Sequence, residues 1–345
     1  MSAAERWRKI YFLTPAFKPV GGIVKIFDYV NHALSCGYEP VICCPQPYEK
    51  GLPLFEIPRF AEINPENGVE FTDLTKVSVG PHDLAYFSWP GHYKLLEARM
   101  SRWTLHEQVI HIVQNVRHSN PEFTDGYALR LLTRPISRIM INDVVLEAAR
   151  PYLNESSLTE VIDLGHETGF FEKFRKDGVG SPLKVGYTTW KSDLGDRVAE
   201  LAGEGTASGF EFAAIREPVD WVQLRELYHW ADVFLATPNV EEGFYMPGLE
   251  AMEAGAIVIS PDAGGNRAYC DFGSNCLGVN FEDPASYAAA LEHLKKQDSG
   301  DIESLREEGY KTVGRFTLEN ERRQFAAFLE KLNNRLREVR LADSG

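Results

Sequence analysis

Two carboxylates, Glu242 and Glu250, lie eight positions apart on either side of a glycine-started loop, Gly243-Phe244-Tyr245-Met246. Pro247 then opens a short apolar pattern with helical spacing. Proline is tolerated at the first helical position because the N–H it lacks would have no partner there. The N–H groups at a helix N-terminus attract anions, and phosphates in particular. The stretch therefore predicts a phosphate-binding loop with one acid at each end.

Alternating strand and helix patterns surround this loop. The predicted strands are residues 182–189, 210–215, 232–238 and 256–265 with its glycine loop, and the predicted helices are 194–204 and 222–231. Such alternation predicts a parallel sheet, whose ligands bind at the carboxyl ends of the strands. Lys191 and Arg216 each lie in a loop that follows one of these strands.

The first half of the chain shows the same alternation. Residues 9–15 read as a buried strand, residues 23–37 as a helix and residues 39–45 as the next strand. Gly21 and Gly22 stand at the helix start, where glycine lets a ligand approach the backbone. A plain turn is the alternative interpretation, and the full dinucleotide fingerprint is absent.

Polar side chains follow two further predicted strands, residues 83–89 and 109–115. His92 comes after the first and His118 after the second. Strand ends of an open parallel sheet are where ligands bind, so His92 is a candidate catalytic residue. A structural or merely exposed histidine is the alternative.

The fold class predicted is α/β, with two doubly wound Rossmann-like domains and a ligand cleft between them. We place the first domain at residues 1–165 and the second at 166–317. A helical segment, 318–345, ends the chain and could cross back to the first domain.

The charge and composition narrow the function. The net charge is −14, and residues 1–150 contain 16 basic and 16 acidic residues, so the whole excess lies in the second half. General nucleic-acid binding is disfavoured by such a balance. A basic helical pattern at 127–139 leaves a membrane or an anionic acceptor open as its partner, although a solvated helix face is the favoured explanation.

Several observations bear on location and metals. No run of 18 apolar residues and no cleavable signal pattern occur, so a cytoplasmic location is expected, possibly at the inner face of the membrane. The five cysteines have no metal-binding spacing and indicate a reducing compartment.

The stretch that begins at Glu242 resembles a known signature. Its sequence, E-G-F-Y-M-P-G-L-E-A-M-E-A-G, is similar to the E-G-F-x-x-P-x-x-E-A-M-A-x-G motif of retaining nucleotide-sugar glycosyltransferases of the family-4 type, which have the GT-B fold. Further similarity is found in A-D-V-F-L at 231–235, in the Gly264-Gly265-Asn266 loop and in R-F-T at 315–317. The resemblance is strong over residues 183–275 and only architectural over 1–165.

The resemblance implies a role for each motif residue. Glu250 would bind the ribose hydroxyls of the nucleotide, and Glu242 would lie beside the transferred sugar. The amides of Gly243 to Met246 would hold the sugar and diphosphate. Lys191 would bind phosphate, and Gly21-Gly22 would face the donor from the first domain.

The chain departs from the family pattern at two places. The arginine that the family has after Gly186 is absent, so Arg216, Arg197 or Arg267 would have to replace it. Ala268 stands where the family has an acid.

The resemblance implies a retaining glycosyltransferase that moves a sugar from a nucleotide-diphosphate donor to a hydroxyl acceptor, with surface-glycan assembly a common setting. No cofactor and no metal are expected, and the acceptor could be a glycan, a lipid-linked molecule or a small molecule. The alternatives are a GT-B epimerase or hydrolase of sugar nucleotides, or a non-catalytic subunit that binds them. The nucleotide base, the sugar and the oligomeric state stay open.

Overall fold

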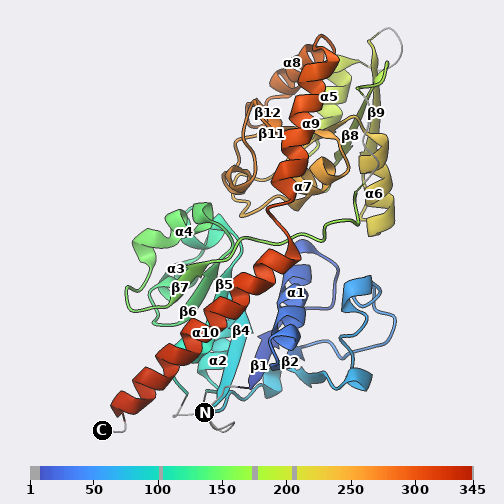
Figure 1. Cartoon of the computed structure of the whole chain (residues 1–345). Coiled ribbons are helices and arrows are strands. Elements are labelled where there is room, and N and C mark those ends of the chain that lie inside the picture. Colours follow the sequence, from blue (N-terminus) through green and yellow to red (C-terminus); the bar gives the residue numbers. More distant parts are fainter. Residues whose placement is uncertain (1–7, 101–103, 173–177, 204–207, 344–345) are drawn as a thin grey trace. The chain divides into compact units, whose positions relative to one another are not determined.

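The computed structural model describes residues 8–100, 104–172, 178–203 and 208–343. The chain divides into two compact units (Figure 1). The first contains the residues up to Asp163 together with those from Glu319 onward, and the second contains Leu164 to Leu318. The C-terminal helix, α10 (Leu318–Asp343), therefore belongs almost wholly to the first unit.

The first unit is built on a parallel sheet of seven strands in the order β3-β2-β1-β4-β5-β6-β7. Its strands are β1 (Lys9–Leu13), β2 (Glu39–Cys44), β3 (Glu70–Asp73), β4 (Asp83–Phe87), β5 (Val109–Val113), β6 (Ser137–Met140) and β7 (Thr159–Val161). Its other α-helices are α1 (Gly21–Ser35), α2 (Pro90–Glu97), α3 (Gly126–Leu132) and α4 (Asp143–Ala149). The strands β1 to β3 follow one another toward one edge of the sheet, and β4 to β7 follow one another from the other side of β1 toward the opposite edge. This change of direction between β1 and β4 is typical of a doubly wound fold.

A buried ionic cluster joins α10 to α1. Lys25 Nζ lies 2.7 Å from Glu321 Oε2, and His32 Nε2 lies 2.9 Å from the same oxygen. Lys25 also pairs with Asp28, at 2.9 Å. These side chains are almost fully buried, and a buried charge is tolerated only when it is paired in this way. The pairs fix the helix that begins at the glycine loop.

The second unit is built on a five-stranded parallel sheet in the order β12-β11-β10-β8-β9. Its strands are β8 (Leu183–Thr188), β9 (Phe210–Ile215), β10 (Val233–Leu235), β11 (Ile257–Pro261) and β12 (Cys276–Val279). Its helices are α5 (Leu194–Ala202), α6 (Trp221–Trp230), α7 (Met246–Glu253), α8 (Pro284–Leu294) and α9 (Ser299–Val313). Aliphatic side chains of β8, β10 and β11 form the core with residues of α5, α8 and α9.

One predicted element is wrong in its extent. The helical pattern over 127–139 is helical only to Leu132, and Ser137 already begins strand β6. Pro135 explains the break, because proline pushes the preceding residue, Arg134, away from the helical conformation. The helix predicted at 194–204 ends at Ala202, and residue 204 lies outside the described residues.

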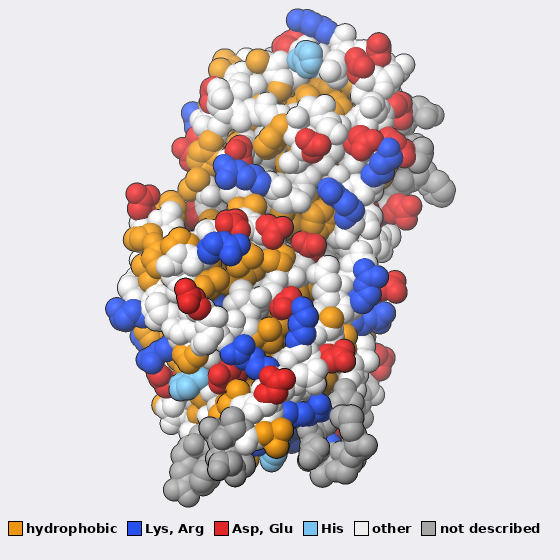
Figure 2. All heavy atoms as spheres, turned by 60° about the vertical axis from the view of Figure 1, so that its left-hand side comes forward, with side chains coloured by type: hydrophobic (Ala, Val, Ile, Leu, Met, Phe, Trp, Pro, Cys, Tyr) orange, Lys and Arg blue, Asp and Glu red, His pale blue; other side chains and the backbone are white. Residues whose placement is uncertain are grey.

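Two further observations concern the surface charge and the hydrophobicity of the helices. Acidic and basic side chains are interspersed over the face drawn in Figure 2. No helix in the described part of the chain is both long enough and apolar enough to span a bilayer.

Candidate active site

Lys191 and Glu242 come together at the carboxyl edge of the second sheet. β8 and β10 are parallel neighbours, so the loops that follow them leave the sheet side by side. Lys191 lies three residues after the end of β8, and Glu242 lies in the loop after β10. Lys191 Nζ donates a hydrogen bond to Glu242 Oε1 and lies 5.0 Å from the centre of the Tyr245 ring. The two candidates that the sequence placed 51 positions apart are therefore direct partners.

The loop from Glu242 to Tyr245 is shaped by close contact with the glycine turn η8 (Gly264–Ala268). The Gly265 N–H donates to the Glu242 carbonyl at 2.9 Å. A Cβ atom added at Gly265 would lie 2.2 Å from the carbonyl carbon of Gly243, which no side chain could tolerate. Glycine at this position is thus required for the two loops to pack backbone to backbone.

The start of α7 is held by a second close approach. Tyr269 Oη donates to the Tyr245 carbonyl at 2.8 Å. A Cβ at Gly248, in the first turn of α7, would lie only 2.3 Å from the same hydroxyl. Both tyrosines are almost fully buried, so the loop and the helix start form one packed unit.

Backbone amides at this helix start are available to a ligand. α7 begins at Met246, one residue before Pro247, and its N-cap residue Tyr245 makes no side-chain capping bond. The N–H groups of Phe244, Tyr245 and Met246 donate to no other described residue. Unpaired amides at a helix N-terminus, together with the helix dipole, favour an anion.

Glu250 lies on α7 in a more enclosed position than Glu242. Its side chain is buried, and its Oε2 accepts a hydrogen bond of 3.0 Å from Tyr228 Oη on α6. Burial raises the pKa of Tyr228 well above its usual value, so this hydroxyl stays protonated and remains a donor. The carboxylate is therefore fixed in place by a residue that sequence reasoning missed.

A third acid of the same helix was also missed. Glu253 Oε2 lies 2.6 Å from His166 Nε2, and the Gly169 N–H donates to the other carboxylate oxygen. The backbone N–H of His166 donates to the Phe316 carbonyl at 2.8 Å. Glu253 thus anchors α7 to the segment through which the chain enters this unit, and the His166 backbone contacts the segment through which it leaves.

The arginines proposed as replacements are engaged with acids or exposed. Arg216 Nη1 lies 2.5 Å from Asp196 Oδ2, and Arg267 Nε lies 2.6 Å from Asp262 Oδ1. Arg197 is exposed on α5. Among these cations and Lys191, only Lys191 contacts the loop that carries Glu242.

The glycine pair lies in the first unit. Gly21 and Gly22 are the first residues of α1. Gln114, just after β5, donates from Nε2 to the Gly22 carbonyl at 3.3 Å, and a Cβ at Gly22 would meet Gln114 Oε1 at 2.8 Å. A Cβ at Gly21 would meet nothing within 4 Å. Because Gln114 Oε1 is the end of a flexible side chain that can move aside, packing imposes no strict need for glycine at either position.

His92 is buried in the same unit. It is the third residue of α2, and only 6% of its surface is exposed. Burial lowers its pKa to about 4, and its Nδ1 has no partner among the described residues. The imidazole is consequently neutral at pH 7.

The described residues contain no group of three or more His, Cys, Asp or Glu side chains placed to hold a metal ion.

Comparisons with known proteins place this geometry in context. Residues 192–297 match the family model described as glycosyl transferases group 1, and this matched segment contains Glu242 and Glu250. D-inositol 3-phosphate glycosyltransferase of Corynebacterium urealyticum is 31% identical over 134 residues, 39% of this chain and 30% of that protein. The enzyme of the same name from Corynebacterium kroppenstedtii is 36% identical over 87 residues, 25% of this chain and 18% of that protein. The chain therefore matches less than a third of the length of either curated relative.

Solved structures resemble nearly the whole chain. Anabaena Alr3699/HepE in complex with UDP and glucose has a TM-score of 0.70 at 15% identity, covering 94% of this chain and 100% of that one. Sucrose-phosphate synthase from Thermosynechococcus elongatus has a TM-score of 0.65 at 14% identity, covering 97% and 100%. With the two parallel sheets, these neighbours confirm the predicted GT-B architecture of two doubly wound Rossmann-like domains. The family match and the curated relatives support a glycosyltransferase.

Proposed function

We propose that this protein is a retaining glycosyltransferase that moves a sugar from a nucleoside-diphosphate donor to a hydroxyl acceptor. The observation that carries the proposal is the Lys191–Glu242 pair beside the unpaired amides of residues 244–246. An ammonium, a carboxylate and a set of amides converge where α7 begins, and the family match covers this segment.

The diphosphate binds at the start of α7. Its negative oxygens accept hydrogen bonds from the amides of Phe244 to Met246 and gain from the helix dipole. Lys191 exchanges its bond to Glu242 for one to a phosphate oxygen. The arginine missing after Gly186 leaves Lys191 as the main cation there.

The two acids bind hydroxyl groups. An ionised carboxylate accepts two hydrogen bonds at once, which suits the neighbouring hydroxyls of a ribose or a sugar. Glu250, held by Tyr228, binds the ribose, and Glu242, released by Lys191, binds the transferred sugar. UDP and glucose, which occur together in the Anabaena neighbour, are the kind of donor parts such a site accepts.

The reaction breaks the bond between the anomeric carbon and the diphosphate oxygen and forms a bond from that carbon to the acceptor oxygen. The acceptor attacks on the same face and its proton passes to the departing phosphate. Negative charge grows on the leaving group, so Lys191 and the amides stabilise the transition state more than the bound donor. His92 of the first unit, which burial keeps neutral, is proposed as a further catalytic residue.

No metal and no cofactor are part of this proposal, since Lys191 and the helix N-terminus supply the positive charge. The proposed partners are the nucleotide sugar and a glycan, lipid-linked or small-molecule acceptor, without nucleic acid. A cytoplasmic location, including the inner face of the membrane, and a role in glycan or glycoconjugate synthesis complete the proposal.

Product analysis with the Glu242→Ala and Lys191→Ala variants tests the function. A panel of nucleotide sugars is incubated with acceptor mixtures, and products are separated and their anomeric configuration determined by NMR. A glycoside with the donor's configuration, formed by the wild type and lost in both variants, supports the proposal. Full transfer activity in both variants would contradict the proposed function. Conversion of the donor without any acceptor would identify an epimerase or hydrolase instead.

A further inference from the structure

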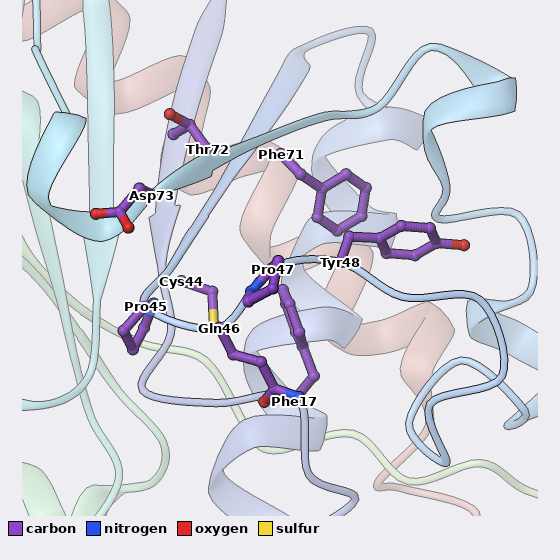
Figure 3. Close-up of a pocket in the computed structure, with 9 residues that line it drawn as sticks. All are labelled: Phe17, Cys44, Pro45, Gln46, Pro47, Tyr48, Phe71, Thr72 and Asp73. Carbon is purple, nitrogen blue, oxygen red and sulfur yellow. The ribbon is translucent and has the colours of Figure 1, made fainter.

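A pocket of about 240 Å³ lies in the first unit and is lined by none of the residues proposed to bind the donor (Figure 3). Its lining comes from three neighbouring segments: Phe17 in the loop after β1, residues 44–48 at and after the end of β2, and residues 71–73 of β3. Sites for drug-sized ligands measure roughly 300–1,000 Å³. This pocket therefore suits a single small ring.

Aromatic rings form one wall of the pocket. Phe71 lies between Tyr48, with ring centres 4.6 Å apart, and Phe17, with ring centres 6.0 Å apart. Phe55 and Phe27 contact Phe17 at 5.3 Å and 6.1 Å, so the wall is held by packing that reaches α1. The ring planes of Tyr48 and Phe71 are inclined by 43° and those of Phe17 and Phe71 by 72°, so the wall offers both ring faces and ring edges. A preformed aromatic wall binds the apolar C–H groups of a small ring without losing side-chain freedom.

Polar groups lie on the other side. Alternate residues of a strand share one face, so Asp73 lies on the same face of β3 as Phe71. Figure 3 shows Asp73 on the far side of the pocket from the rings of Phe71 and Tyr48. Thr75 donates to Asp73 from its hydroxyl and its N–H, which lowers the pKa of this acid and keeps it ionised. Gln46 Nε2, also at the pocket, donates to no other described residue.

The charge of the pocket is negative. Its described lining contains no lysine, arginine or histidine, and Asp73 is its one ionised side chain. Burial raises the pKa of the Cys44 thiol to about 11, so this sulfur is neutral at pH 7. A phosphate or carboxylate would meet a like charge with no compensating cation in the wall.

We propose that this pocket binds an uncharged polyhydroxylated ring, a sugar or a cyclitol, packed against the rings of Phe71 and Tyr48 and hydrogen-bonded to Asp73 and Gln46. The further assignment of this ring to the acceptor rests on the proposed glycosyltransferase function. Phe17 supports that assignment, because it lies four residues before Gly21 in the loop that leads into α1. The pocket and the glycine pair thus share one connecting segment.

The test is a binding titration of the full chain by saturation-transfer NMR. The probes are the methyl glycosides of glucose, galactose, mannose and N-acetylglucosamine, with myo-inositol, and glucose 6-phosphate and inositol 1-phosphate as charged counterparts. We expect at least one neutral probe to bind saturably. The phosphorylated counterpart is expected to bind with an affinity lower by about tenfold or more, because its charge is repelled by Asp73.

Two variants and one control locate the binding. Tyr48→Ala, at a half-buried ring, is expected to weaken binding by about fivefold or more through lost packing. Asp73→Asn is expected to lower the affinity for the neutral probe. It is also expected to reduce the difference in affinity between that probe and its phosphorylated counterpart, because the negative charge is lost. Phe123→Ala removes an exposed ring elsewhere in the same unit and is expected to change nothing.

Different results would contradict the pocket proposal and the proposed glycosyltransferase function. If no neutral probe saturates, if the phosphate binds more tightly, or if Tyr48→Ala binds like the wild type, the pocket proposal is wrong. Nucleotide-sugar binding is measured in the same samples. Neutral-probe binding without any nucleotide binding overturns the glycosyltransferase function and the acceptor role together, but not the ring site itself.

Discussion

Lys191 Nζ donates a hydrogen bond to Glu242 Oε1, and the carboxylate side chain is only 14% exposed. The cation proposed for the phosphate and the acid proposed for the sugar therefore satisfy each other when no donor is bound. In the proposed reaction a donor would separate them, because the phosphate is a stronger partner for the ammonium and a sugar hydroxyl would take its place at the acid. Donor binding would then also free both proposed catalytic groups.

Replacing Lys191 by alanine should lower kcat by about 10²–10³-fold, because it removes a donor to the charge that develops on the leaving phosphate. Lys191→Arg should recover part of the rate, as it keeps the charge with a different donor geometry. Steady-state kinetics measure both effects. Lys296→Ala, which removes an exposed lysine of the same unit, is the control and should behave as the wild type. An unchanged kcat in Lys191→Ala would remove this lysine from the mechanism.

Glu250→Gln should weaken binding of a ribonucleoside diphosphate by about tenfold or more, because a charged acceptor of the ribose hydroxyls is lost. The 2′- and 3′-deoxy analogues of the same nucleotide provide a double-mutant cycle measured by calorimetry. In the wild type at least one deoxy analogue should bind more weakly, and in the variant this difference should disappear. A difference of the same size in both proteins would show that Glu250 does not contact the ribose.

Gly265→Ala should distort the donor loop. The added Cβ would lie 2.2 Å from a backbone atom of Gly243, so the backbone must shift, at a cost of roughly 1–3 kcal/mol in stability. Donor affinity should fall even where the variant is folded, which circular dichroism and calorimetry together will show. Gly314→Ala in the same unit, where the added atom makes only ordinary contacts, should leave both quantities unchanged. Wild-type affinity in folded Gly265→Ala would mean that the loop does not bind the donor.

His92 should make stability depend on pH. Its pKa is lowered to about 4 in the folded protein, so between pH 4 and 6.5 the unfolded chain binds more protons than the folded one. Stability consequently falls as the pH falls, by about 2 kcal/mol from this residue between pH 7 and pH 5. Urea denaturation of the wild type and of His92→Gln at these pH values measures it. The variant should lose less stability on acidification, and parallel losses in both would contradict a buried neutral His92.

The sequence was sufficient for the architecture because most central strands are short apolar runs and alternate with segments of helical periodicity. The glycines and acids of residues 242–250 predicted a donor-binding loop, and that role stays a prediction. The sequence was misleading at 127–139, where apolar spacing continued past the proline that ends α3. Residues 276–313 contain strand β12 and two helices that we did not predict.

The partners of the site residues could not be predicted. Tyr228 is 22 positions from Glu250, and His166 is 87 positions from Glu253, so only the folded sheet brings them together. The close approach of Gly265 to Gly243 likewise depends on how two loops pack, which no local spacing records. These long-range contacts hold the loop and helix that the motif identifies.

Donor binding by the second unit is the decisive measurement for the proposed glycosyltransferase function. The thermal unfolding midpoint is measured for the wild type, Lys191→Ala and Glu250→Gln against UDP, GDP, ADP, TDP and CMP and their sugar derivatives. Ligands that bind the folded state stabilise it in proportion to the logarithm of their concentration. We predict that one nucleotide series raises the wild-type midpoint saturably and that both variants lose most of this shift. A flat response of the wild type across the whole panel would contradict the account.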